Sequence, residues 1–361
     1  MMIWWNEVRT VRHVVKQSML ALLICLGAVG CAPAPAQRSV PDAEEIWSVT
    51  LSGAASQGET SSDFAATRRA IIAGDRIVVV FETGPTVFVG NRPKSTYRLL
   101  SLDLKTGAVR NQRDISDYRN PDLYAADDNH IVMGEFSLTR LNPDLTSTSE
   151  QFTEKGRGRT IQMSPDGSTL AHETTPGTEL LDSHTFLPTG PRLTESTPTA
   201  VSRNAVLTDN VHWIGQYPHD ATFVTLTDKS GQHLLYHGQC SGRPTFLNDT
   251  KVLVTGCGKI TILDVSGRIV REANLRSKAG DFAGVSRDGA RFAIQNSEST
   301  WGDPPRIRSE SFTIYDSEKA EPLAIIRSKS LPERRSWSAF SKDGHLFVMG
   351  SSAKLSLFHI P

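Results

Sequence analysis

Residue types that can do chemistry are present in this 361-residue chain, but they are scattered along it. The sequence contains no Gly-x-Ser-x-Gly nucleophile turn, no P-loop and no His-Glu-x-x-His metal motif. His233 and His237 are four residues apart on a predicted strand, so they share a face. At the rise of a strand they lie about 13 Å apart, too far to chelate one ion. We therefore expect no catalytic residues, no metal site and no cofactor.

Two further segments combine acidic residues with histidine or with one another. His219-Asp220 is either an acid–base pair or part of a solvated loop that contacts a ligand. Asp127-Asp128 resembles part of a calcium loop, but alternating oxygen ligands are missing. We interpret Asp127-Asp128 as turn-forming residues.

The N-terminal residues have the pattern of an export signal. Arg9, Arg12 and Lys16 precede an apolar run, Met19 to Val29, that is too short to cross about 30 Å of hydrocarbon. We predict a signal peptide over residues 1–30, which makes the mature protein an exported one.

The end of this signal resembles a bacterial lipobox. Ala28-Val29-Gly30-Cys31 consists of small residues followed by cysteine, which implies that Cys31 is lipidated. The alternative is ordinary cleavage after Ala34-Pro35-Ala36. The Pro/Ala-rich residues 31–44 are predicted to be a tether between the lipid and the fold.

Export places the two remaining cysteines, Cys240 and Cys257, in an oxidising compartment. If a hairpin turns at Asn248-Asp249, cross-strand partners have numbers that add up to about 497, as 240 and 257 do. We expect a disulfide between Cys240 and Cys257; two free thiols, or a redox or metal-binding pair, are the alternatives.

The charge is balanced, with 39 Lys+Arg against 39 Asp+Glu. Neither a nucleic acid nor an anionic membrane surface is indicated by bulk charge. A membrane partner is expected only through the lipid anchor.

A repeated turn indicates the architecture. "SPDGSTLA" from Ser164 returns as "SRDGARFA" from Ser286 and "SKDGHLFV" from Ser341. Asp-Gly supplies the positive φ of a tight hairpin turn, and an alternating or apolar strand follows each one. Weaker versions of the turn bring the total to seven: Gly74-Asp75, Asp127-Asp128-Asn129, Arg203-Asn204 and Asn248-Asp249.

A second signal, an apolar strand that ends in a polar turn, follows each of these turns. Two turn signals in about 40 to 45 residues imply four short strands per unit, the period of a β-propeller blade. We predict an all-β fold: a single seven-bladed propeller over residues 45–361. The last unit has three strands, so we expect Ile46–Leu51 to supply its fourth strand and close the ring; a frayed strand is the alternative.

The "SPDG", "SRDG" and "SKDG" turns, with "SLD", "LLD", "ILD" and "IYD" at strand ends, resemble bacterial WD-repeat-like and quinoprotein-like propellers. The resemblance implies the architecture and leaves the function open. Trp-Asp dipeptides are missing, and "DLKTGAVRN" lacks the tryptophan of the quinoprotein motif, so pyrroloquinoline quinone is not expected. The matching residues are turn formers: Asp166, Gly167, Asp288, Gly289, Asp343 and Gly344.

The functional prediction rests on three long links between second and third strands, at residues 82–96, 214–221 and 296–311. These links share one face of a propeller, and their aromatic and arginine residues are typical interface anchors. The expected partner-binding residues are Phe88, Arg92, Tyr217, His219, Trp301, Arg306 and Arg308. The alternative is that Phe88 and Trp301 only cover the rim of the core.

We therefore predict an exported, monomeric propeller that binds another envelope protein or an exported peptide as a scaffold in the bacterial cell envelope. The lipid would hold it at the outer membrane or the periplasmic face. The alternative function is an envelope enzyme that acts on a sugar or lactone in the central channel. Such an enzyme needs carboxylates or histidines that converge from several first strands.

Overall fold

The structure is a computed structural model. Val40–Pro361 forms one compact unit. In the part of the chain that is described, no helix has the length and apolar character needed to cross a membrane. The structure describes residues 39–51, 67–83, 87–89, 92–117, 121–134, 137–153, 161–174, 177–190, 192–194, 198–212, 221–238, 244–256, 258–275, 280–299, 307–327, 337–351 and 354–361.

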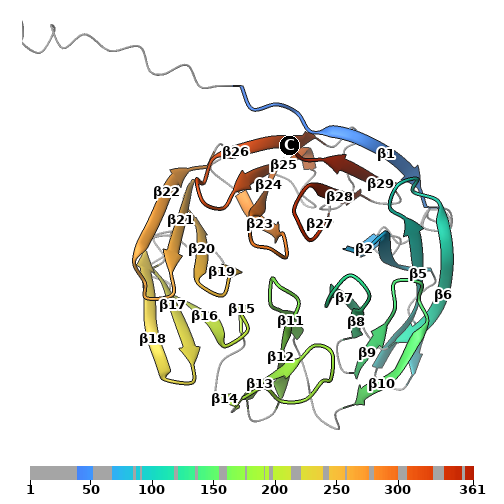
Figure 1. Ribbon diagram of the computed structural model, residues 1–361, viewed down its shortest axis with the longest axis horizontal. Coiled ribbons are helices and arrows are strands. Elements are labelled where there is room, and N and C mark those ends of the chain that lie inside the picture. Colours follow the sequence, from blue (N-terminus) through green and yellow to red (C-terminus); the bar gives the residue numbers. More distant parts are fainter. Residues whose placement is uncertain are drawn as a thin grey trace, which may run out of the picture. The chain divides into compact units, whose positions relative to one another are not determined.

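Seven antiparallel sheets form the blades of a propeller, as the repeat predicts (Figure 1). Blade one contains β2 (Thr67–Ala73), β3 (Arg76–Glu82), β4 (Val87–Val89), β5 (Arg92–Asp103) and β6 (Val109–Asp117); blade two contains β7 (Asp122–Ala125), β8 (Ile131–Gly134), β9 (Ser137–Leu141) and β10 (Ser147–Thr153). Blade three contains β11 (Ile161–Met163), β12 (Thr169–Thr174), β13 (Gly177–Asp182) and β14 (Leu193–Thr194); blade four contains β15 (Ala200–Val201), β16 (Ala205–His212), β17 (Ala221–Asp228) and β18 (Gly231–Gly238). Blade five contains β19 (Thr245–Asn248), β20 (Lys251–Gly256), β21 (Lys259–Asp264) and β22 (Ile269–Asn274); blade six contains β23 (Gly280–Val285), β24 (Arg291–Ser299), β25 (Ile307–Asp316) and β26 (Pro322–Arg327). Blade seven contains β27 (Trp337–Phe340), β28 (Leu346–Ser351), β29 (Lys354–His359) and β1 (Glu44–Thr50).

All seven predicted turns lie between the first and second strands of a blade, which confirms the repeat. In blade three, the Ser164 hydroxyl donates to Asp166 Oδ1 (2.6 Å) and accepts from the Thr169 backbone N–H (2.9 Å). Asp166 Oδ1 also accepts from the Ser168 N–H at 3.1 Å. The turns at Ser286 and Ser341 repeat these bonds with the same residue types, so the repeated letters encode one hydrogen-bonded turn.

The N-terminal strand closes the ring, as predicted. β1 pairs with β29, and the sheet runs β1-β29-β28-β27, so the first and last described strands lie side by side (Figure 1). Trp47 donates its indole N–H to the Leu104 carbonyl of blade one at 2.9 Å. The ordered contacts begin earlier than the predicted boundary, because Ala43 N–H donates to the Ile325 carbonyl at 2.8 Å. The C-terminal end of the segment predicted as a tether is thus paired with β26 of blade six.

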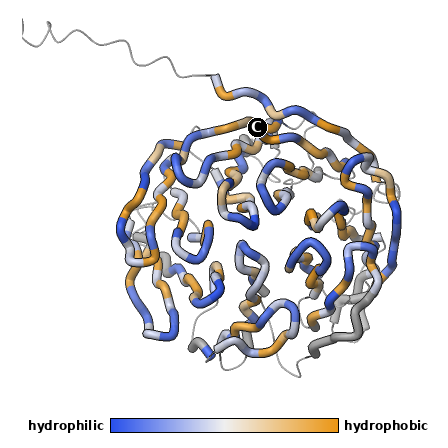
Figure 2. Tube along the Cα trace, viewed as in Figure 1, coloured by the Kyte–Doolittle hydropathy of each residue, from blue (hydrophilic) through white to orange (hydrophobic). Residues whose placement is uncertain are grey.

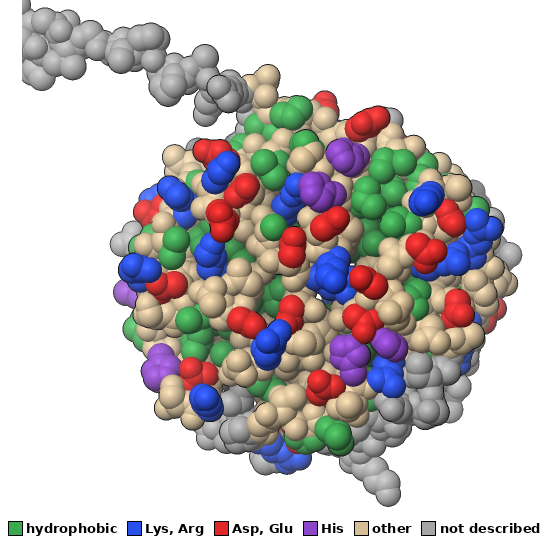
Figure 3. All heavy atoms as spheres, viewed as in Figure 1, with side chains coloured by type: hydrophobic (Ala, Val, Ile, Leu, Met, Phe, Trp, Pro, Cys, Tyr) green, Lys and Arg blue, Asp and Glu red, His purple; other side chains and the backbone are tan. Residues whose placement is uncertain are grey.

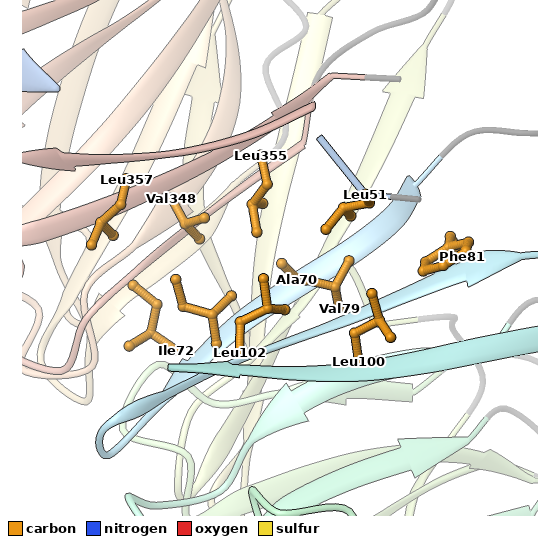
Figure 4. Close-up of a cluster of buried hydrophobic side chains, with 11 residues drawn as sticks. Leu51, Ala70, Ile72, Val79, Phe81, Leu100, Leu102, Val348, Leu355 and Leu357 are labelled. Atoms are coloured by element: carbon orange, nitrogen blue, oxygen red, sulfur yellow. The ribbon is translucent and has the colours of Figure 1, made fainter. Parts of the chain in front are cut away.

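Apolar side chains fill the spaces between neighbouring blades. Between blades one and seven, one cluster joins Val79 and Leu102 to Val348 and Leu355 (Figure 4). In Figure 2, hydrophilic residues gather at the turns around the centre, whereas apolar residues are found along the strands. An apolar cluster of this kind lies at each boundary between neighbouring blades, so each blade packs apolar side chains on both of its faces.

Two of the predicted long links are shorter than expected, and their predicted extents were wrong. In blade one, β4 pairs with β5 as a hairpin with Val89 opposite Arg92. In blade six, β24 and β25 stay paired out to Ser299 opposite Ile307. The β-branched and aromatic run of β4 favours a strand, and the Gly-Asn that follows it is a hairpin signal.

An engineered disulfide between β1 and β29 tests the ring closure. Ser48 lies opposite Ser356, and the two hydroxyl oxygens are 3.0 Å apart. Ser48→Cys with Ser356→Cys should form a disulfide, because the Cβ atoms of a cross-strand pair are close enough for the two sulfur atoms to bond. Mass spectrometry of non-reduced peptides measures it.

The matched control pairs Ser48→Cys with Lys354→Cys, since Lys354 lies opposite Thr50, two residues along the same strand. Diagonal neighbours are about 7 to 8 Å apart and should crosslink far less. Equal yields for the two pairs, or no Ser48–Ser356 link, would contradict the pairing.

Candidate functional site

One face of the ring carries the turns that join first to second and third to fourth strands; we call it the turn face. Its carboxylates are largely occupied in building the turns. Asp103 accepts hydrogen bonds from the Thr106 side chain and from Arg110, and these bonds lower the pKa of Asp103 to about 2. The Ser266 hydroxyl likewise lowers the pKa of Asp264 to about 2. Such residues act in structure rather than in proton transfer.

An ion-pair network crosses the mouth of the central channel on this face. The guanidinium of Arg287, from the blade-six turn, donates to Asp128 Oδ1 in the blade-two turn, and these blades are not neighbours. Lys342 of blade seven approaches Asp128 Oδ2 at 3.8 Å. Figure 3 shows acidic and basic side chains gathered around the middle of this face. The side chain of Arg287 is only 13% exposed, so the carboxylate of Asp128 compensates for the loss of water around a largely buried guanidinium.

First strands of blades one, two, three, six and seven line an open cavity of about 430 Å³ in the channel. Arg69 lies on its wall with its Nε 3.0 Å from Asp122 Oδ1, and its guanidinium carbon is 5.3 Å from the centre of the Tyr124 ring. The Tyr124 hydroxyl donates to Asp122 Oδ2 at 3.3 Å. Burial raises the pKa of the Tyr124 hydroxyl, so this phenol stays protonated.

The chemistry that this cavity can perform is restricted by its lining. Apart from Arg69, Arg287, Tyr124 and Gln295, the described lining side chains are apolar or small, and no histidine or carboxylate is among them. Asp122 instead pairs with Arg69. The described residues therefore provide a cationic and aromatic binding surface without an acid–base pair.

A cluster that sequence reasoning missed lies on the turn face. Asp127 Oδ2 is 2.8 Å from His130 Nδ1 and 2.7 Å from Nε2 of His184, which belongs to the neighbouring blade three. Burial raises the pKa of Asp127, but hydrogen bonds from His130 and His184 and from the Asn129 backbone N–H outweigh it, so the pKa lies below its usual value.

The prediction that Asp127 forms a turn is confirmed, since its Oδ1 accepts the backbone N–H groups of Asn129 and His130. What the sequence did not reveal is the approach of His184, 57 positions away. The available signal was weak: a histidine that follows a turn aspartate in each of two successive units.

A groove of about 400 Å³ lies between blades four and five on the same face. Leu234 and Val265 line it and are 62% and 40% exposed. Asp228 and Asp249 also line it. Exposed apolar residues rimmed by charge are typical of surfaces that bind other molecules.

The structure places three of the predicted partner-binding residues on paired strands. Phe88 lies on β4 opposite Pro93, Arg92 begins β5, and Arg308 lies on β25. Phe88 and Arg92 are thus on one hairpin. The other four predicted partner-binding residues, together with the predicted lipid site Cys31, lie outside the described residues: Tyr217, His219, Trp301 and Arg306.

Cys240 and Cys257 also lie outside the described residues. The hairpin that was expected to align them is present, with Phe246 opposite Val252 and Thr245 opposite Leu253. This register is one residue away from the expected one. Because neither cysteine is among the described residues, the disulfide stays a prediction.

The chain is similar in fold to solved structures that include the following two. The crystal structure of BamB from Moraxella catarrhalis is 13% identical, with a TM-score of 0.44, over 88% of this chain and 99% of that chain. The C-terminal WD40 domain of Sif2 is 12% identical, with a TM-score of 0.47, over 89% of this chain and 99% of that chain. Neither a protein-family model nor a curated protein matches the chain.

The ion pair across the channel mouth predicts a stability effect. Asp128→Ala removes the partner of a guanidinium that is largely buried, and should lower the free energy of unfolding by about 1 to 3 kcal/mol. Urea denaturation measures it. The control is Asp75→Ala. Asp75 also pairs with an arginine, with 3.4 Å between its Oδ1 and Arg76 Nε, but its side chain is 80% exposed. Because water screens an exposed ion pair, this substitution should lower the free energy of unfolding by less than about 0.5 kcal/mol. Equal effects of the two variants would show that the Arg287 contact contributes nothing.

Proposed function

We propose that this protein is an exported, monomeric propeller that serves as a protein- or peptide-binding scaffold in the bacterial cell envelope. Its N-terminal residues 1–30 act as the signal peptide, and a lipid on Cys31 anchors it at the outer membrane or the periplasmic face. The partner binds the face opposite the turn face, which we call the loop face. The expected contacts there are Phe88, Arg92, Tyr217, His219, Trp301, Arg306 and Arg308.

The observation that carries this proposal is the pair of hairpins that extend from blades one and six. β5 is 12 residues long and β25 is 10 residues long, whereas most other strands have four to eight. The hairpins bear aromatic and arginine residues, at Phe88, Arg92 and Arg308, on paired backbone. A paired backbone loses less conformational entropy on binding than a loop does, which favours recognition of a partner.

The enzyme alternative, action on a sugar or lactone in the channel, has less support. It requires converging carboxylates or histidines, and the described lining offers arginines, Tyr124 and Gln295 instead. Arg69 and Arg287, the two charged residues of that lining, are each paired with an aspartate. A lining of this kind favours binding over proton transfer.

Site-specific photo-crosslinking in the native host tests the scaffold. A crosslinking residue at Trp301 or at Arg308 should capture the same envelope protein, and that purified protein should bind the purified chain. The matched control is Glu318, which is in the same blade but on the turn face and is 81% exposed; it should capture nothing specific. If a crosslinking residue at Leu234 captures the protein and one at Trp301 does not, the partner binds in the groove between blades four and five. That result would contradict the loop-face assignment.

A substitution of Cys31 in the native host tests the lipid anchor. Cys31→Ala should move the protein from the membrane fraction to the soluble fraction and abolish labelling by a fatty-acid probe, since one thioether-linked lipid cysteine provides the attachment. Retention of the variant in the membrane fraction with unchanged labelling would contradict lipidation at Cys31. Absence of labelling in the unchanged protein would instead support ordinary cleavage at the later position, after Ala36.

A further inference from the structure

The side chains of Asp127, His130 and His184 converge at the boundary between blades two and three on the turn face. Asp127 and His130 belong to the turn between β7 and β8, and His184 belongs to the turn after β13. One carboxylate oxygen and two imidazole nitrogens lie within 4.8 Å of one another. The three side chains are between 30% and 39% exposed, so an ion can enter from solvent.

We propose that Asp127, His130 and His184 form a binding site for a divalent transition-metal ion of the zinc type, with a coordination position left open. This assignment departs from the expectation of no metal site, which rested on spacing within single segments. The three ligands come from two blades, and only the fold brings them together.

The ligand types select the class of ion. Two imidazole nitrogens and one carboxylate oxygen suit Zn²⁺ and its neighbours in the first transition row, whereas Ca²⁺ and Mg²⁺ prefer oxygen ligands throughout. Zinc sites with three protein ligands keep a fourth position for water or for an incoming group. Because this site faces solvent, that fourth ligand is a water molecule or a side chain of a bound partner.

The neighbouring contacts hold each ligand in a suitable orientation. Asp127 Oδ1 accepts the backbone N–H groups of Asn129 at 2.6 Å and of His130 at 2.7 Å, which directs Oδ2 toward the imidazoles. On the other blade, His184 Nδ1 lies 3.1 Å from the hydroxyl of Ser183, a fully buried residue. When Nδ1–H donates a hydrogen bond to that hydroxyl, Nε2 is unprotonated and presents its lone pair to the ion, as in the supporting contacts of known zinc ligands.

The two distances from Asp127 to the imidazoles require only a small adjustment, and the two imidazole nitrogens lie within 4.8 Å of each other. Tetrahedral ligands at about 2.0 Å from zinc are about 3.3 Å apart. Asp127 Oδ2 is 2.7 to 2.8 Å from the two nitrogens, so each pair must separate by about half an ångström. Rotation of exposed side chains can supply this movement. A bound ion would then link the blade-two turn to the blade-three turn.

Metal titration of the full-length chain tests the site. The protein is purified in detergent without a polyhistidine tag, stripped with a chelator and titrated with Zn²⁺ by isothermal calorimetry. We expect one ion per chain, a rise of the melting temperature with Zn²⁺, and intense visible bands when Co²⁺ replaces zinc. His184→Ala and His130→Ala should each abolish the stoichiometric binding, and Ser183→Ala should weaken it about tenfold.

The matched control is His233→Ala. His233 is an exposed histidine whose Nε2 lies 3.7 Å from one oxygen of Asp228, and among the described residues it belongs to no group of three potential metal ligands. This control variant should bind Zn²⁺ as the unchanged chain does. The metal-free melting temperatures of the variants report folding separately. Absence of stoichiometric binding in the unchanged chain, or equal affinity in His184→Ala and in the control, would overturn the site.

Discussion

The ring depends on the close approach of inner turns to the backbone of a neighbouring blade, as at Gly167 and Gly289. A Cβ atom built on Gly167 of blade three would overlap the carbonyl oxygen of Ala126 in blade two, and one on Gly289 of blade six would overlap that of Leu247 in blade five. Both glycines also have positive φ, at 79° and 71°. Glycine is therefore required at each position for two reasons: the positive φ of the turn and the close packing against the neighbouring blade. The buried serine and the aspartate beside it fix the same turn by hydrogen bonds.

Once the turns are docked, the rest of the architecture follows from burial. Each blade places apolar side chains on both faces, so a blade without two neighbours would expose one face to water. Among the described residues, three strands follow residue 336, and β1 completes the seventh blade by pairing with β29. This pairing covers a strand edge that would otherwise remain open, and Trp47 extends the contact into blade one.

Local patterns were sufficient to predict the turns, the number of blades and the closing strand. They failed where distant segments meet. The contact of His184 with Asp127 depends on how two successive blades are rotated, and the Arg287–Asp128 pair crosses the channel between blades that are not neighbours. Hairpin extension in blade one was also missed, because the short run at β4 was counted as part of a loop. Contacts between residues of different blades cannot be predicted from spacing along the chain, because they form only when the ring closes.

The two faces of the ring therefore have different roles in this account: the turn face holds the blades together and bears the proposed ion, and the loop face bears the proposed partner contacts. The measurement that tests the central constraint most directly is the urea denaturation of Gly167→Ala beside Gly190→Ala. Gly190 has open space around its Cβ position, so its variant should change the free energy of unfolding by less than about 0.5 kcal/mol. Gly167→Ala should lower it by about 1 to 3 kcal/mol or more, because it combines backbone strain with the overlap on Ala126. Equal stabilities of the two variants would contradict the docking of turns as the basis of the ring.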